Sequence, residues 1–534
     1  MYDVVVIGSG FGGAMVAHEL VRAGMRVLML ERGKSVVAGG EHRDAVWDFF
    51  QLGPAYDAEA PYRVKHRGRG SAEGMLACVG GVSVFYGGAS FRLRESDFRP
   101  GPEMVGESGA EWPFGYAELE PFYTRAEQLL NVAGEAGTDP TEPQRSAPYP
   151  RTPAPLAPIS REIGAAARRL GLHPFRVPLA LNDGCTTCTS SDGYASGGVA
   201  RIIHDLLQAH PGFALREQTV AVRLLEERGR IVGVECVDRV GGKRETIRAN
   251  MFVLAAGALA SPHLLLASGL ERMNPGGPAV GSYLMRHCNA FVYGLFPNFP
   301  EPGRHHKQIA INDFYVDEQG RKLGNLQQVM HPQLGGVLRR PAAVVRHAGT
   351  AGRVALGVLA RGLQPVTHRM TGLQVIAEDQ PQARNRVEVD WSTIDRWGLP
   401  RLRIHHDYTR RDLAARAELV RRAKQVLREA HALPLLYTYK VTTFSHAVGT
   451  VRMGTDQKTS ALDEHCRFRG VENLFVTDGS FMPTSGGVNP SLTIAANALR
   501  VGAHIASPHP ASQARLSLSH RWERGGEGRS PQPG

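Results

Sequence analysis

A glycine-rich turn lies close to the beginning of the sequence, between two short apolar segments. Residues 3–8 (DVVVIG) and 26–31 (RVLMLE) are aliphatic runs typical of buried parallel strands. Residues 12–24, between them, have the apolar spacing of a helix. The segment therefore predicts a strand, turn, helix and strand within about 30 residues, which is the first unit of a doubly wound α/β sheet.

The glycines of this turn fit the dinucleotide-binding fingerprint. Gly8 allows the tight turn, Gly10 lets the backbone approach a pyrophosphate, and Gly13 lets the helix pack close to the strand. Phe11 and Gly12 complete the turn, and the helix start offers free N–H groups to phosphate oxygens. We therefore predict that all five residues contact a dinucleotide cofactor.

An acidic residue ends the second strand. Glu31 lies eighteen residues after Gly13, where a carboxylate can accept hydrogen bonds from a ribose diol. An acid here favours a free ribose over a 2′-phosphate. It does not distinguish NAD from FAD.

Two more segments favour FAD. Residues 80–88 (GGVSVFYGG) form a loop that can lie flat against a cofactor, with contacts predicted for Gly80, Gly81 and Ser83. Residues 473–480 (NLFVTDGS) place Asp478 and Gly479 at the end of a buried strand. A carboxylate there can bind a ribityl hydroxyl, which NAD lacks. Asp478 can equally be a helix N-cap, and both roles can coexist.

Distinctive motifs continue along the chain to about residue 505. Besides the fingerprint and GGVSVFYGG, they are EWPFGYAELEPFY at 111–123, FVLAAGALASPHLLLASG at 252–269, GSYLMRH at 281–287, SHAVGTVRMG at 445–454 and LFVTDGSFMPTSGGVNPSLTIAANALR at 474–500. Together they resemble the glucose–methanol–choline (GMC) family of flavin oxidoreductases. The resemblance implies an FAD enzyme acting on alcohols.

The same resemblance implies roles for individual residues. His446, in HAVGT, matches the catalytic histidine, and Asn489, in GVNPSLT, matches the second active-site position. Val220 matches a backbone contact to the adenine, and Gly257 and Pro490 fall in segments that contact the cofactor. Some relatives attach FAD covalently through a histidine in the segment matching GGVSVFYGG. This segment has no histidine, so we expect noncovalent FAD.

The chemistry of alcohol oxidation suits His446 and Asn489. A neutral histidine can take the hydroxyl proton as a hydride leaves carbon, so His446 is the predicted base. Asn489 can donate to the developing alkoxide, or it can simply cap the helix that starts at Pro490. FAD would accept the hydride, giving an aldehyde or a ketone. Arg452 either positions an anionic group or pairs with an acid.

The predicted architecture is α/β. A Rossmann-like FAD-binding domain is built from discontinuous segments, beside an α+β substrate-binding domain with an antiparallel sheet. The FAD-binding domain takes residues 1–100, 185–288 and 440–506, and the substrate-binding domain takes 101–184 and 289–439. Residues 507–534, rich in Ser, Pro, Gly and Arg, are predicted to be a disordered tail.

Periodicity predicts the remaining elements. Helices are expected at 116–131, 160–172, 200–210, 409–431 and 490–505, with another from 261. Strands are expected within 213–240 around a turn at 227–229, and at 251–257, 374–377, 386–390, 401–405 and 473–478. Residues 140–158 are predicted to be a connecting loop. The strands between 374 and 405 are expected to form one antiparallel sheet backed by helices.

The positive charge of the chain is unevenly distributed. The net charge is +11, but no nucleic-acid-binding motif accompanies it, so no nucleic acid partner is expected. No Asp or Glu lies between Glu318 and Glu378. Within that interval, residues 339–361 form either an Arg-rich surface helix, which we favour, or a basic helix that lids the active site or makes weak membrane-surface contact. Without a signal peptide or a long apolar segment, we expect a cytoplasmic protein, peripheral at the membrane if 339–361 bind lipid.

Several functional alternatives are compatible with these motifs. The electron acceptor is dioxygen, a quinone or another carrier, and the Arg-rich interval favours a dehydrogenase over an oxidase. A hydroxynitrile lyase of the same fold and a non-catalytic flavin-binding protein are the rival functions. Sugars, sterols, polyols and polyketide-like alcohols all fit as substrates. Cys185 and Cys188 have CxxC spacing but no second pair, so we expect a loop there and no metal site.

Overall fold

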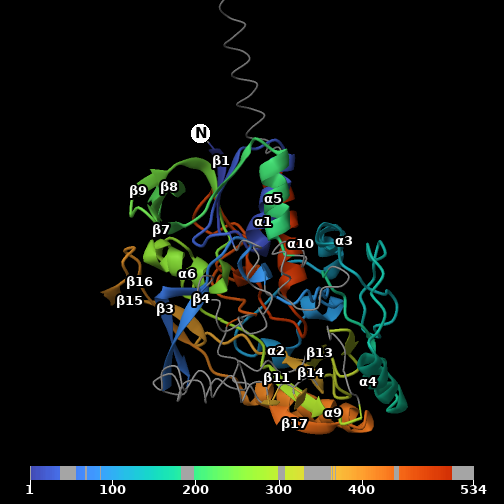
Figure 1. Ribbon diagram of the computed structural model, residues 1–534. Helices are drawn as coiled ribbons and strands as arrows, with labels where there is room; N and C mark the ends of the chain where they lie inside the picture. The colour runs from blue at the N-terminus through green and yellow to red at the C-terminus, as the bar shows by residue number, and fades with distance from the viewer. Residues whose placement is uncertain are drawn as a thin grey trace, which may run out of the picture.

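The computed structural model describes residues 2–35, 56–66, 69–84, 86–181, 198–298, 307–329, 362–363, 365–366, 369–437, 444 and 446–507, with the backbone alone for 56–66, 69–76 and 436–437. The described residues form four sheets, and one of these has only parallel strands (Figure 1). The predicted α/β class is therefore confirmed.

The parallel sheet has five strands in the order β18-β10-β1-β2-β6. They are β1 (Tyr2–Ile7), β2 (Val27–Leu30), β6 (Phe213–Arg216), β10 (Ala249–Leu254) and β18 (Leu474–Val476). Val4, Val5 and Val6 have no exposed surface, as expected of a strand covered on both faces. The first strand of the chain therefore lies at the centre of a sheet that the last strand completes.

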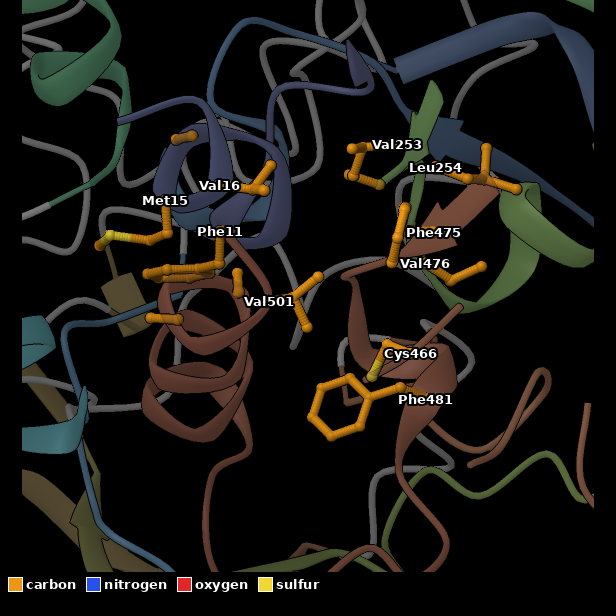
Figure 2. Close-up of a cluster of buried hydrophobic side chains, with 14 of the residues drawn as sticks. Phe11, Met15, Val16, Val253, Leu254, Cys466, Phe475, Val476, Phe481 and Val501 are labelled. Carbon is orange, nitrogen blue, oxygen red and sulfur yellow. The ribbon is translucent and has the colours of Figure 1, made fainter. Parts of the chain in front are cut away.

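Helices α1 (Phe11–Arg22), α5 (Ala200–Ala209) and α10 (Ser491–Ala506) lie on one side of this sheet (Figure 1). α10 also packs against α3 (Tyr116–Leu130). Gly502 lets α10 approach α1 closely, because a Cβ there would lie 2.7 Å from the Cβ of Glu19. Figure 2 shows the resulting core, in which apolar side chains of α1, α10, β10 and β18 meet.

A three-stranded antiparallel meander covers the other side of the parallel sheet. It comprises β7 (Thr219–Glu227), β8 (Arg230–Asp238) and β9 (Arg244–Ile247), and it packs beside α6 (Gly257–Ala267). The turn predicted at 227–229 is confirmed. Arg228 and Gly229 both have positive φ, at 52° and 78°, as a two-residue hairpin turn favours.

Helix α6 begins four residues before the predicted start. Pro262 lies inside it and supplies no N–H to the carbonyl of Ala258. The Thr450 hydroxyl donates to that carbonyl instead, over 2.7 Å. A long-range contact therefore allows a helix turn that the sequence alone did not predict.

A six-stranded antiparallel sheet lies at the opposite end of the molecule (Figure 1). Its strands, in the order β17-β11-β14-β13-β12-β5, are β5 (Phe175–Arg176), β11 (Ala290–Leu295), β12 (Ile309–Ile311), β13 (Gly324–Val329), β14 (Met370–Ala377) and β17 (Leu433–Tyr437). α4 (Pro158–Arg169) and α9 (Arg410–Glu429) cover one face with an apolar core. The other face carries the carboxamides of Asn325, Gln327 and Gln374, because residues paired directly across strands share a face.

The prediction of one antiparallel sheet for residues 374–405 is wrong. β15 (Arg386–Ile394) and β16 (Pro400–His405) form a separate four-stranded sheet with β3 (Tyr56–His66) and β4 (Arg69–Leu76). β16 pairs with β3 in parallel, which joins segments about 340 residues apart. Pairing between such distant segments leaves no trace in local periodicity.

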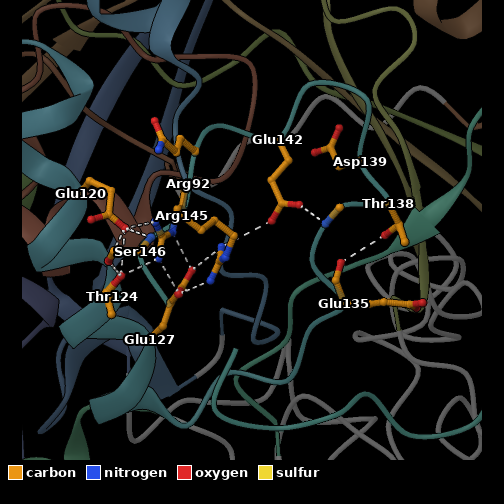
Figure 3. A network of polar contacts seen from close by, with 12 residues as sticks. Arg92, Glu120, Thr124, Glu127, Glu135, Thr138, Asp139, Glu142, Arg145 and Ser146 are labelled. Atoms are coloured by element: carbon orange, nitrogen blue, oxygen red, sulfur yellow. Dashed lines mark hydrogen bonds and ion pairs between the residues drawn. The ribbon is translucent and has the colours of Figure 1, made fainter. Parts of the chain in front are cut away.

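A buried ion network fixes the predicted loop at 140–158 against α3 (Figure 3). The Arg92 guanidinium donates twice to the Glu127 carboxylate, over 2.9 and 2.8 Å. Arg145, from the loop, donates to the same carboxylate over 2.5 Å.

In the described ranges no helix is long and apolar enough to cross a bilayer.

Candidate active site

The glycine turn before α1 divides into packing positions and one open position. A Cβ would lie 2.4 Å from the Ala255 carbonyl oxygen at Gly8, and 2.0 Å from the Gly8 oxygen at Gly13. At Gly12 it would lie 2.4 Å from the Thr477 oxygen. At Gly10 it would meet nothing within 4 Å. α1 also starts without a side-chain cap or an acid in its first turn, so the turn fits an anionic pyrophosphate.

Glu31 is buried beside this turn. Its carboxylate accepts the Ser9 and Gly33 backbone N–H groups, over 3.2 and 2.8 Å, and the Ser9 hydroxyl. Burial raises the pKa of Glu31. The Glu31 carbonyl accepts the Thr219 N–H over 2.8 Å, which brings β7 and Val220 next to it. Glu31 and Val220, predicted at the two ends of an adenosine, therefore lie on adjoining segments.

The loop predicted to lie on the cofactor crosses the glycine turn. Gly80 donates its N–H to the Ser9 hydroxyl over 3.0 Å, and a Cβ at Gly81 would lie 3.4 Å from the Gly10 Cα. The Ser83 hydroxyl donates to the Gly80 carbonyl over 2.6 Å and accepts the Val199 N–H over 3.1 Å. The Ser83 side chain therefore holds the loop in shape.

Asp478 joins the end of β18 to α6. It accepts the Ser480 N–H over 2.9 Å as the N-cap of the 3-10 turn at Gly479–Phe481, and the Gly257 N–H over 3.0 Å. Burial raises the pKa of Asp478. The capping role considered for Asp478 is therefore observed, and the ribityl contact stays a prediction.

The structure brings His446 and Asn489 together. The His446 Nε2 lies 3.4 Å from the Asn489 Nδ2. The Asn489 Oδ1 accepts the Nε2–H of buried Gln327 over 2.9 Å, which aims the amide nitrogen at His446. α10 starts after Pro490 without a side-chain cap, so the helix-cap interpretation of Asn489 is wrong.

A third side chain completes this cluster, and the sequence analysis did not single it out. His287 contacts His446 through the two Nδ1 atoms, 2.9 Å apart. Its own Nε2 lies 2.9 Å from the Gly486 carbonyl oxygen. The GSYLMRH motif ends on His287, but the motif alone does not indicate a partner.

Burial and neighbouring charges set the protonation of the two imidazoles. Burial, followed by the nearby His287 and Lys307, lowers the pKa of His446 well below 6.5. Burial likewise lowers the pKa of His287. Both rings are therefore neutral near pH 7. His446 has the protonation state that a general base needs.

A buried carboxylate lies behind the imidazole pair. Asp379 accepts the backbone N–H groups of Arg286 and His287, over 2.8 and 3.0 Å. Burial opposes its ionisation, but the nearby His406 and His287 side chains and the Arg286 N–H lower the pKa of Asp379. Its negative charge can therefore stabilise a proton that arrives on the pair.

The acid pairing considered for Arg452 is not observed among the described residues, and the other role considered for it, positioning an anionic group, stays a prediction. Its guanidinium packs 3.6 Å from the centre of the Tyr283 ring and donates from Nε to the Thr459 carbonyl over 2.8 Å. No ion pair of Arg452 is found within the described ranges. Burial lowers the pKa of Arg452 to about 10.

The described part of the chain contains no cluster of His, Cys, Asp or Glu able to hold a metal ion. Cys185 and Cys188 lie outside the described residues, as do the interval 339–361 and the tail from 508.

Comparison with known proteins identifies the family of this chain. Two sequence models described as GMC oxidoreductase match residues 73–289 and 381–498. The 6'''-hydroxyparomomycin C oxidase of Streptomyces lividus is 32% identical over 96% of this chain and 93% of its own. The 2-methyl-1,2-propanediol dehydrogenase of Mycolicibacterium austroafricanum is 28% identical over 94% of this chain and 95% of its own.

A solved structure has the same fold. Pyridoxine 4-oxidase from Mesorbium loti superposes with a TM-score of 0.66 and 19% identity, over 95% of this chain and all of that one. The chain therefore belongs to the GMC oxidoreductase family, whose members use FAD.

Proposed function

We propose that this protein binds FAD noncovalently and oxidises an alcohol CH–OH group to a carbonyl, with His446 as the base. The observation that carries the proposal is the 3.4 Å contact between the Nε2 of neutral His446 and the Nδ2 of Asn489. One base and one donor converge there, as removal of a hydroxyl proton and stabilisation of an alkoxide require.

One set of residues would hold FAD, and another would act on the alcohol. The turn at Gly8–Gly13 and the loop at 80–84 would hold the pyrophosphate, and Glu31 would hold a ribose hydroxyl. Asp478 would reorganise its capping contacts to share a ribityl hydroxyl. Bound FAD supplies the hydride acceptor. His446 takes the hydroxyl proton on Nε2, while Asn489 donates to the oxygen that loses it.

The sheet face beside Asn489 favours a hydroxyl-rich substrate over a sterol. Gln327 and Gln374 are paired across β13 and β14, and the Gln327 Oε1 has no hydrogen-bond partner among the residues that the structure describes. Carboxamides both donate and accept, as a substrate with several hydroxyl groups requires. Phe291, paired with Gln374, stacks with Tyr293 at 6.2 Å between ring centres and offers an apolar surface. The names of both curated relatives describe compounds with hydroxyl groups.

The test is anaerobic reduction of the purified yellow enzyme, followed as loss of the oxidised flavin absorbance. The alcohols are 6'''-hydroxyparomomycin C, 2-methyl-1,2-propanediol, a hexose and cholesterol. We expect bleaching by a polyhydroxylated compound and none by cholesterol. Bleaching means that the alcohol has reduced the flavin and has itself been oxidised, so it also argues against a hydroxynitrile lyase and against a purely binding role. A protein that takes up no FAD contradicts the proposal.

Rapid mixing of the reduced enzyme with electron acceptors tests how the reduced flavin is reoxidised. One relative reported above is named an oxidase and the other a dehydrogenase. Fast reoxidation by dioxygen identifies an oxidase. Slow reoxidation by dioxygen with fast reduction of a soluble quinone identifies a dehydrogenase. Binding to anionic vesicles tests the predicted membrane-surface contact of residues 339–361.

A further inference from the structure

His287 occupies a position in which each ring nitrogen has a defined role. The side chain is buried, with 1% of its surface exposed. Its Nε2 lies 2.9 Å from the Gly486 carbonyl oxygen and 3.3 Å from that of Ser485. Carbonyl oxygens only accept, so Nε2 must carry the proton. In the neutral ring, Nδ1 is then left with a lone pair.

This assignment determines the tautomer of the second ring. The Nδ1 atoms of His287 and His446 are 2.9 Å apart, and a hydrogen bond between them needs one proton. Because His287 Nδ1 accepts, His446 Nδ1 must donate. The lone pair of His446 is then on Nε2, which faces the Asn489 amide.

We propose that His287 is a positioning residue that fixes His446 in its Nδ1–H tautomer and directs the Nε2 lone pair toward the alcohol. The inference rests on the proposed function of His446 as the base. A chain of hydrogen bonds runs from the alcohol hydroxyl through His446 and His287 to the Gly486 carbonyl.

The backbone at His287 supports a specific role. His287 has a φ of 60°, in the left-handed region that only a few per cent of residues other than Gly adopt, mostly Asn, Asp and His. Asp379 holds it there by accepting the N–H groups of Arg286 and His287, and the Tyr408 hydroxyl donates to the His287 carbonyl over 2.8 Å. Backbone strain held by such contacts is concentrated at functional sites.

The arrangement also suits the state after proton transfer. The alcohol proton is then on His446 Nε2, and the ring carries a positive charge. Its Nδ1–H bond to His287 becomes charge-assisted and stronger. The charged side chains near the ring are Asp379, which favours this state, and Arg286 and Lys307, which oppose it.

The decisive experiment compares two substitutions of His287 with FAD bound. H287L removes the acceptor for His446 Nδ1–H. H287N keeps an oxygen in reach and tolerates positive φ. For H287L we expect the rate constant of anaerobic flavin reduction to fall roughly 10²–10⁴-fold, as for an imidazole in the wrong tautomer. For H287N we expect a loss within about tenfold. H204Q, at an exposed histidine of α5, is the control and should keep the wild-type rate constant.

A second readout does not depend on turnover. In protein with ¹⁵N-labelled histidine, the His446 signals are those that H446Q removes. We expect a protonated Nδ1 and an unprotonated Nε2 in the wild type and in H287N, and loss of this pattern in H287L. If H287L fails to fold, the wild-type spectrum and H287N still test the proposal.

The outcomes separate the two proposals. A protonated Nε2 in the wild type, or an unchanged rate constant in H287L, overturns the role of His287. An unchanged rate constant in H446Q overturns His446 as the base, whatever the tautomer.

Discussion

The two halves of the site are built in different ways. The glycine turn at Gly8–Gly13 is local in sequence and works through backbone atoms, with a Cβ excluded by contacts as short as 2.0 Å. The reacting half uses side chains of His287, Gln327, His446 and Asn489, which come from four separate segments. The cofactor half therefore depends on glycines, whose missing side chains let backbone atoms come close. The reacting half depends on hydrogen-bond partners that orient each side chain.

The largest effect is expected at the base. H446Q should lower the rate constant of flavin reduction about 10²–10⁴-fold, because proton removal loses its catalyst. The FAD content should stay that of the wild type, since the glycine turn is untouched. Stopped-flow absorbance measures the rate constant of flavin reduction, and the ratio of flavin to protein absorbance measures the FAD content. H204Q on the exposed face of α5 is the control for the rate constant. Loss of FAD in H446Q would contradict the division between the two halves.

Substitutions in the glycine turn should change protein stability or FAD binding and should not act on proton removal. G13A places a methyl group 2.0 Å from the Gly8 oxygen and should destabilise the protein by about 1–3 kcal/mol. G10A meets nothing within 4 Å, so the FAD-free protein should keep its stability while FAD binding weakens. Thermal unfolding and fluorescence titration with FAD check the pair. Equal destabilisation by both changes would show that Gly10 is also a packing position.

An intermediate effect is expected at Gln327, which orients Asn489 without being predicted to contact the reacting oxygen. Q327L removes the donor to Asn489 Oδ1 and should slow flavin reduction about tenfold, equivalent to one lost hydrogen bond. Q327E keeps the side-chain shape but offers only acceptors, so its rate constant of flavin reduction should be as low as that of Q327L. Recovery of the rate constant in Q327E would mean that shape, and not donation, orients Asn489.

The smallest effect is expected from pH. An imidazole with a pKa of 6.5 would be mostly protonated at pH 6, and a base would lose about fourfold in rate. Because burial and His287 lower the pKa of His446, the neutral form persists to lower pH. The rate constant of flavin reduction should therefore change less than about twofold between pH 8 and pH 6. A decrease centred near pH 6.5 would contradict this.

The same division explains what the sequence could predict. The strand, turn and helix around Gly8–Gly13 follow from neighbouring residues, so their bounds agree with the structure to within two residues. The parallel β16–β3 pair and the early start of α6 depend on distant contacts, and both were missed. His446 and Asn489 were selected by resemblance, but His287 and Gln327 become visible only through the hydrogen bonds that they make.

The position of β18 has a consequence for how the protein is made. β18 is residues 474–476, yet it pairs with β10, which pairs with β1 from residues 2–7. At roughly 5–20 residues per second, a ribosome needs about 10–45 s to reach β18 after making β10. During that interval the apolar edge of β10 has no neighbouring strand and is exposed to aggregation. Asp478, which the cofactor prediction needs, is made only after β18, so soluble yield should depend on chaperones that cover the β10 edge until then.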